Sequence, residues 1–245
     1  SRRMIKKSIL ISLGNLFFRY RSYIPIPIIF LAFYFYYISP INKINPSIFN
    51  YCLSISLTGL LIRVLVVGYS FDKTSGRNTK SQLASKINKT GIYSLIRHPL
   101  YIGNFLIWLG ASLITNNLYF VLFSIFFYWL IYIPIILAEE DYLTKKFKNE
   151  YKLYSLNVPA IIPNFKKWIK PELNFNLRKV LLNEKNGLLG IFTIFYFFKV
   201  LDLYKKNESI FQLNKILFFF VFSLLFYFLI KIYQKINKFH LDTSD

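Results

Sequence analysis

The chain has 245 residues, of which 55% are apolar and 20% aromatic, and its mean hydropathy is positive at +0.40. This composition excludes an ordinary soluble domain, and several apolar runs are long enough to cross a bilayer. The formal net charge is +20, from 31 Lys and Arg against 11 Asp and Glu. We therefore expect an all-α, polytopic membrane protein with about six transmembrane helices in a single domain, 1–245.

The first part of the chain predicts two spans after a surface segment. Residues 8–20 are basic and partly amphipathic, and we expect them to lie along the membrane. The first span, 23–39, has two prolines near its start, where a missing N–H does least harm. The second span, 48–69, contains Arg63. This arginine either pairs with an acidic side chain or an anionic headgroup, or extends to the membrane surface.

The rest of the chain predicts four more spans. A polar segment, 71–91, leads to a third span that ends near Thr115. Asn116 and Asn117 are expected to form a tight turn into the fourth span, 118–137, which stops at an acidic cluster. The remaining elements are a polar segment at 142–186 and spans at 187–201 and 213–230.

The positive charges fall unevenly on the two sides of this predicted topology. With six spans, 25 of the 31 Lys and Arg lie on the side that carries both termini. Basic residues concentrate on the cytoplasmic side of membrane proteins. We therefore expect cytoplasmic termini and a cytoplasmic-face active site. Because topology accounts for the charge, nucleic acid is not an expected partner.

The stretch TGIYSLIRHPLYIGNFLIWLG, 90–110, places ionisable groups where a polar segment becomes apolar. It contains one of the two histidines, His98, between Arg97 and a proline. Charged groups are costly in hydrocarbon, so this cluster should face protein or water rather than lipid. The third and fourth spans form a helical hairpin, so Glu139 and Glu140 should lie at the same membrane face as His98. The sequence therefore predicts a site there.

These motifs resemble a known family. GIYSLIRHPLYIGN, followed one hairpin later by AEEDYLTKKFKNEYKLYSLNVPAIIP, is similar to the isoprenylcysteine carboxyl methyltransferase and phospholipid methyltransferase family. The family pattern is a Gly-Tyr dipeptide, Arg-His-Pro-x-Tyr, a pair of glutamates, and an aromatic series that ends at prolines. The resemblance covers a methyltransferase core of roughly 50–165, with 1–49 and 187–245 as additional helices.

The chain departs from the family pattern at two places. Ile92 separates Gly91 from Tyr93, which are adjacent in relatives. Lys148 stands where relatives commonly have glycine after an aromatic residue. Neither departure removes a side chain to which the resemblance assigns a ligand.

The resemblance implies an integral-membrane methyltransferase that uses S-adenosylmethionine, without a Rossmann domain and without a metal. Arg97 and His98 would bind the cofactor carboxylate, and Glu139 or Glu140 its ammonium or ribose hydroxyls. Tyrosines would supply aromatic faces to the adenine or the sulfonium, and Gly103 would let a ligand approach the backbone. Catalytic roles are predicted for Arg97 and Glu140. The predicted cofactor-binding residues are Tyr93, His98, Tyr101, Gly103, Glu139, Glu140, Tyr151 and Tyr154.

The acceptor is expected to be a lipid or lipid-linked molecule that enters sideways between helices. An anionic oxygen, a carboxylate or a phosphate, needs no general base, and rate would come from alignment and exclusion of water. An amine acceptor must first lose a proton, with Glu140 or His98 as candidate base. We expect an anionic acceptor, with a lipid A phosphate as one candidate, in a bacterial inner membrane. The oligomeric state stays open.

Two other classes of membrane protein are alternatives to a methyltransferase. Membrane sterol and enone reductases share the helical plan, use NADPH and have a related Arg-His-x-Asn-Tyr signature. Here Pro99 and Leu100 precede Tyr101, so the asparagine is missing, which favours methyl transfer. A channel or transporter would place polar or broken helices along a path through the midplane. In this chain the charges gather at one rim instead.

Overall fold

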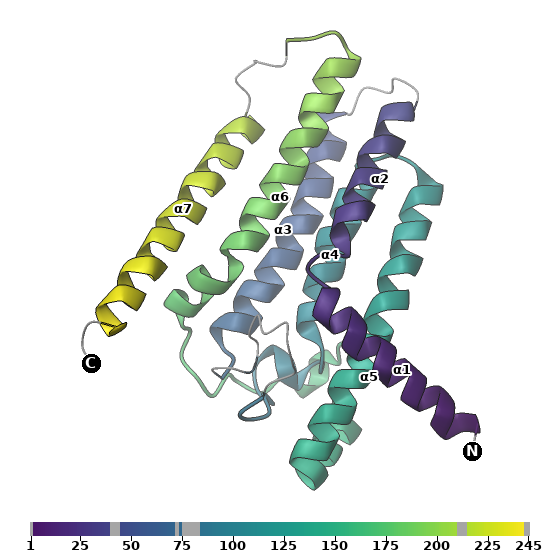
Figure 1. The fold of residues 1–245 in the computed structure, drawn as a ribbon, viewed down its shortest axis with the longest axis vertical. Helices are drawn as coiled ribbons and strands as arrows, with labels where there is room; N and C mark the ends of the chain where they lie inside the picture. Colours follow the sequence, from purple (N-terminus) through teal and green to yellow (C-terminus); the bar gives the residue numbers. More distant parts are fainter. Residues whose placement is uncertain (1, 40–44, 72–73, 75–83, 210–214, 243–245) are drawn as a thin grey trace.

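The computed structural model is built of helices joined by loops (Figure 1). The structure describes residues 2–39, 45–71, 74, 84–209 and 215–242. The helices are α1 Arg2–Tyr20, α2 Pro25–Ile38, α3 Pro46–Gly68, η1 Ile92–Ser94, α4 Pro99–Leu113, α5 Leu118–Asn157, η2 Phe165–Lys167, α6 Leu177–Lys205 and α7 Lys215–Asp242. These ranges contain no strand, and one isolated β-bridge joins Gly91 to Ile169. The predicted all-α class is confirmed.

Four helices, α3, α5, α6 and α7, are long and apolar enough to cross a membrane. Helices α1 and α2 meet at a short break with a bend of 73°, and together they would count as a fifth span. Helix α4 is apolar but has only 15 residues. The chain is thus a polytopic membrane protein, while the count of six spans stays a prediction.

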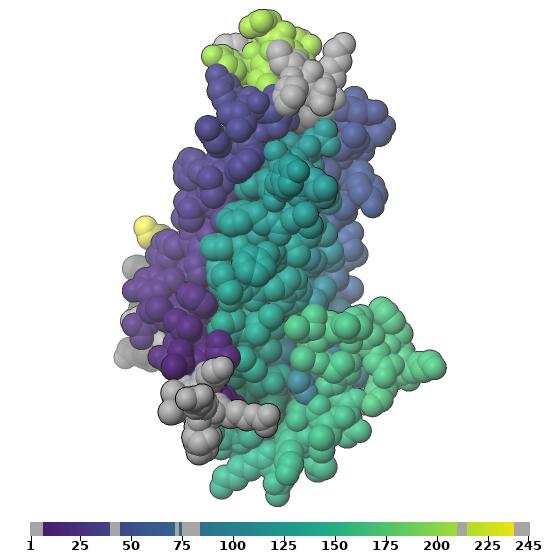
Figure 2. Space-filling model, turned by 90° about the vertical axis from the view of Figure 1, so that its right-hand side faces the viewer, coloured from purple at the N-terminus to yellow at the C-terminus, as the bar shows by residue number. Residues whose placement is uncertain are grey.

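The helices form a bundle with most of the long loops at one end (Figure 1). Helix α3 packs against α4 and α6, α5 packs against α4 and α1, and α7 packs against α6. The start of α1 and the end of α7 lie at the same end of the bundle, as predicted for the two termini (Figure 1). Figure 2 shows α1 and α2 along the side of the central helices. The segment that follows α5 projects from the end of the bundle at which α1 lies.

Small residues let α3 and α4 approach closely. A Cβ added at Gly110 would lie 2.9 Å from the backbone nitrogen of Ser56. One added at Gly103 would lie 2.8 Å from the carbonyl oxygen of Gly59 and 2.6 Å from Cγ of Arg63. In a membrane, such close backbone packing supplies helix association that the hydrophobic effect does not. This contact sets the spacing of the two helices beside the site.

The predicted turn between the third and fourth spans is confirmed. Asn116 adopts a φ of 50°, a left-handed conformation that asparagine tolerates. The Asn117 side chain accepts a hydrogen bond from the N–H of Phe120 at 3.0 Å and so caps α5. The α4–α5 hairpin that brings the two motifs together therefore follows from local sequence.

Two helices extend beyond the apolar runs that predicted them. Helix α5 continues to Asn157 and α6 begins at Leu177, so the expected polar segment 142–186 is helical at both ends. Hydropathy detects only the part of a helix that suits lipid, whereas a polar extension is stabilised by caps and ion pairs. The Asn176 side chain, for example, accepts a hydrogen bond from the N–H of Lys179 at 2.9 Å.

Helix α5 is kinked at Lys148, whose φ of 46° and ψ of −117° are not helical. A residue with a Cβ avoids this region, while glycine enters it readily. Beyond the kink, the Tyr154 hydroxyl donates a hydrogen bond to the carbonyl of Tyr93 at 2.7 Å. A strained backbone position thus folds the end of α5 against η1, at the place where relatives commonly have glycine.

Lys148→Gly should raise the thermal stability of the detergent-purified protein. Glycine relieves the strain at positive φ, and we expect a net gain of about 1 kcal/mol after its larger loss of backbone entropy. Lys152→Gly, at an exposed helical position of α5, should instead cost about 1 kcal/mol. Thermal unfolding of both variants makes the comparison. A Lys148→Gly protein less stable than the parent contradicts the assignment of strain.

Candidate functional site

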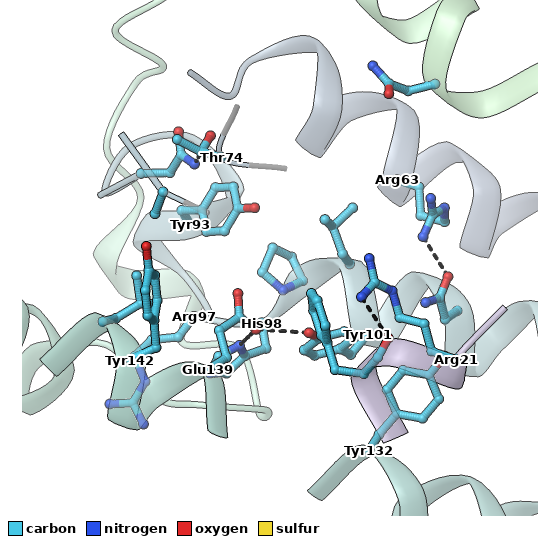
Figure 3. A pocket seen from close by; sticks show the side chains of 18 of the residues that line it. Arg21, Arg63, Thr74, Tyr93, Arg97, His98, Tyr101, Tyr132, Glu139 and Tyr142 are labelled. Atoms are coloured by element: carbon cyan, nitrogen blue, oxygen red, sulfur yellow. Dashed lines mark hydrogen bonds and ion pairs between the residues drawn. The ribbon is translucent and has the colours of Figure 1, made fainter. Parts of the chain in front are cut away.

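A cavity of about 740 Å³ lies where η1 and the start of α4 meet α5 (Figure 3). Its wall comes from the α1–α2 break, α3, the loop before α4, α4, α5 and the start of α6. This volume is in the range of small-molecule sites. Arg21 and Glu184 also line it, so the wall includes residues outside the expected core 50–165.

His98 lies at the centre of the site, just before α4, and is 5% exposed. Its Nε2 is 3.1 Å from Oε1 of Glu140, and its Nδ1 is 3.4 Å from Oε2 of Glu139. The same Glu139 oxygen accepts a hydrogen bond from the Tyr101 hydroxyl at 2.9 Å. The two motif clusters, predicted to share one face of the membrane, are therefore in direct contact.

The charge of His98 follows from these contacts. Burial lowers the pKa of His98, but the hydrogen bonds and charges of Glu139 and Glu140 together outweigh burial and hold the pKa above its ordinary value of 6.5. These contacts favour the protonated, cationic form of His98 between the two carboxylates. A protonated imidazole cannot accept a proton, so the geometry does not favour His98 as the base for an amine acceptor.

Arg97 contacts this cluster from the other side of Glu140. Its Nη2 lies 2.6 Å from Oε1 of Glu140, and its Nη1 donates a hydrogen bond to the carbonyl of Ser155 at 2.6 Å. Arg97 thereby ties the loop before α4 to the part of α5 beyond the kink. Its partner Glu140 holds both Arg97 and His98.

Seven of the predicted site residues line the cavity, while Gly103 and Glu140 lie outside its lining. Helix α3 fills the space beside Gly103, so the prediction that Gly103 admits a ligand to the backbone is not supported. Glu140 acts on the site through the two cations that it contacts. The seven lining residues are Tyr93, Arg97, His98, Tyr101, Glu139, Tyr151 and Tyr154.

The tyrosines divide between two ends of the cavity. Tyr93 lies at one end, and Tyr101 and Tyr132 lie toward the other (Figure 3). Tyr151 is 2% exposed and lines the cavity, and its hydroxyl has no hydrogen-bond partner within the described ranges. An unpaired buried hydroxyl is unfavourable. At a cavity wall it marks a place where a ligand can supply the missing partner.

Arg63 and Glu184 form a bidentate ion pair that the sequence did not predict as part of the site. Nε and Nη2 of Arg63 are each 2.8 Å from a Glu184 oxygen, and Nη1 donates to Oδ1 of Asn104 at 2.6 Å. Of the alternatives for Arg63, pairing with an acidic side chain is confirmed. Glu184 was missed because the hydropathy pattern placed it in a polar segment. The available signal was a buried arginine in need of a counter-ion.

Across the described residues, no group of three or more His, Cys, Asp or Glu side chains is arranged to hold a metal ion. The ionisable side chains of the site instead pair with one another.

Comparison with known proteins finds a family match for the central part of the chain. Residues 50–150 match the family model described as phospholipid methyltransferase. The family recognised from the motifs is therefore confirmed for the central region of the chain. The matched residues include most of α3, all of α4 and most of α5.

Three of the similar curated proteins are named protein-S-isoprenylcysteine O-methyltransferase. That of Schizosaccharomyces pombe is 34% identical over 95 residues, 36% of this chain and 40% of the relative. That of Saccharomyces cerevisiae is 32% identical over 128 residues, 48% and 54% of the two chains. The B form of Arabidopsis thaliana is 29% identical over 119 residues, 46% and 58%. The chain spans about half the length of these relatives, and no solved structure matches it.

The stability of the protein should fall as the pH rises above 6.5. The folded-state pKa of His98 is raised, so its pairing with Glu139 and Glu140 contributes fully below 6.5 and is lost as the pH rises through the folded-state pKa. His98→Asn keeps a hydrogen-bonding group but cannot ionise. Thermal unfolding of both proteins across this range should show a steeper loss in the parent. If the two proteins lose thermal stability in parallel as the pH rises, His98 does not carry the charge assigned to it.

Proposed function

We propose that the chain is an integral-membrane methyltransferase that uses S-adenosylmethionine and methylates a lipid or lipid-linked acceptor. The observation that carries this proposal is the cavity, in which the family-motif residues His98, Glu139 and Tyr101 come together at the polar end of an apolar bundle. The methyltransferase names of the relatives support it. A bacterial inner membrane stays part of the proposal.

The cavity residues fit the chemical groups of the proposed cofactor. The buried, unpaired Tyr151 hydroxyl offers a hydrogen bond that nothing in the described protein satisfies. Tyr93 and Tyr154 add aromatic surface beside it. The Glu139 carboxylate, which lines the cavity, suits an ammonium or hydroxyl group. When bound, the cofactor supplies a methyl group carried by a sulfonium.

The ionisable groups favour an acceptor that is already anionic. His98 is protonated and held by Glu139 and Glu140, so the centre of the site presents fixed charges and hydrogen bonds rather than a ready proton acceptor. A carboxylate or phosphate oxygen needs no proton removed, so the protein has only to align the reacting groups and exclude water. A lipid A phosphate and a prenylcysteine carboxylate both have this chemistry.

Ligand binding to the detergent-purified protein tests the proposal. Calorimetric titrations with S-adenosylmethionine, S-adenosylhomocysteine and NADPH should show saturable binding of the two adenosyl compounds and none of NADPH. Labelled methyl groups can then be followed into a lipid extract. Binding of NADPH alone would instead identify a membrane reductase and refute the methyltransferase.

Tyr151→Phe separates ligand binding from folding. Removing a hydroxyl that has no partner should leave the thermal stability of the ligand-free protein unchanged or raise it. The same change should weaken S-adenosylmethionine binding roughly fivefold, the value of one neutral hydrogen bond.

Tyr154→Phe is the matched control for Tyr151→Phe. Its hydroxyl donates to the carbonyl of Tyr93, so its loss should lower stability by about 1 kcal/mol. If Tyr151→Phe binds S-adenosylmethionine as tightly as the parent does, the Tyr151 hydroxyl does not contact the cofactor.

A further inference from the structure

Arg21 lies at the break between α1 and α2 and lines the cavity beside Tyr101 and Tyr132, away from Tyr93 (Figure 3). Its guanidinium lies 3.7 Å from the centre of the Phe18 ring and donates a hydrogen bond to the Phe18 carbonyl at 3.0 Å. These contacts fix the position of the guanidinium at the wall. Arg21 falls outside the matched residues 50–150, so the family match assigns it no role.

Close packing of α1 on α5 is what brings Arg21 to the cavity. A Cβ added at Gly14 would clash with the carbonyl of Pro134 and lie 2.9 Å from Cβ of Ala138. Helix α1 therefore crosses α5 at Pro134 and Ala138, directly before Glu139. The charge of Arg21 is near enough to act on the Glu139 carboxylate.

Cations outnumber carboxylates on the cavity wall. Glu139 contacts His98, and Glu184 contacts Arg63. Even with Glu140 counted against Arg97, the wall keeps an excess of positive charge. The lining cations are Arg21, Arg63, Lys86, Arg97 and His98, and the lining carboxylates are Glu139 and Glu184. An anionic ligand is therefore favoured.

Apolar side chains share the cavity lining with Arg21. Phe18 and Pro25 belong to the same break between α1 and α2, and Ile107 and Trp108 belong to α4. A charged group beside apolar walls matches an amphiphile, in which an acidic group is attached to a hydrocarbon chain. A small, fully polar anion would leave these walls without a partner.

We infer that Arg21 determines acceptor specificity by binding the acidic group, a carboxylate or a phosphate monoester, of an anionic amphiphile. A guanidinium that holds one oxygen of such a group leaves another oxygen for the methyl transfer. The bond between the methyl carbon and sulfur would break, with its electron pair left on sulfur. The acceptor oxygen would form the new bond to the methyl carbon, so no proton is released. This inference rests on the proposed function and names the residue that selects the acceptor.

Acid and amide forms of one amphiphile test the inference. N-acetyl-S-farnesylcysteine and its carboxamide are titrated by calorimetry into the detergent-purified protein, with S-adenosylhomocysteine present. The parent should bind the acid roughly 10- to 100-fold more tightly than the amide, the value of a charged hydrogen bond. Arg21→Gln should lose this preference. Arg19→Gln, at an exposed position of the same helix end, should keep it.

The outcomes for Arg21 differ from those for the proposed function. Dioleoyl phosphatidic acid in a second titration decides between phosphate and carboxylate, and a preference of the parent for either acid supports the inference. Equal binding of the cysteine acid and its amide together with no binding of phosphatidic acid, or no binding of either acid, overturns it. A loss of S-adenosylmethionine affinity in Arg21→Gln also overturns it, because Arg21 then serves the cofactor. Failure of the parent to bind S-adenosylmethionine refutes the proposed function itself.

A purely structural role for Arg21, as a cap of α1, predicts a different result. Arg21→Gln would then lower the thermal stability and weaken the acid and the amide to the same degree. Unchanged cofactor binding together with a selective loss of acid binding excludes that role. Thermal unfolding of Arg21→Gln and Arg19→Gln provides the comparison.

Discussion

An ionised side chain in an apolar bundle must find its counter-charge within the protein, and this constraint organises the cavity. Arg63 occupies α3 well inside a candidate span, where lipid offers it nothing. Glu184 of α6 and Asn104 of α4 provide its partners. One ion pair thereby fixes the distances among three helices. Breaking such a pair by removing one partner costs about 3–5 kcal/mol, because the other charge remains buried.

The same constraint explains how two adjacent glutamates serve different functions. Successive residues on a helix point about 100° apart, so Glu139 and Glu140 reach the two nitrogens of His98 from different directions. Glu139 then meets the Tyr101 hydroxyl at the cavity, while Glu140 meets Arg97 behind it. A pair of acids that looked equivalent in sequence becomes one carboxylate that faces the ligand space and one that holds the cations.

Local patterns predicted the all-α class, the α4–α5 hairpin and the meeting of its two polar ends, since each depends on nearby residues. Partners far apart in sequence were beyond such patterns. Nothing near Glu184 marks it as the counter-ion of Arg63, 121 residues away, and hydropathy ended the helices where the charges began. Arg21 was hidden for the same reason, because only the crossing of α1 over α5 brings it to the cavity. Gly103 packs against α3, and a packing glycine and a ligand-facing glycine look alike in sequence.

The residues that line the cavity come from two parts of the chain, one inside and one outside the family match. Its centre, with His98, Glu139 and Tyr101, comes from the region that matches the methyltransferase family, whereas Arg21 and Glu184 come from helices outside that match. In the proposed function, the cofactor contacts the family motifs, and the acceptor meets the wall that α1 and α6 complete. Cofactor chemistry would then follow the family, while acceptor choice would vary with the flanking helices. Relatives that align only over the central region can therefore share methyl transfer and still differ in the molecule that they methylate.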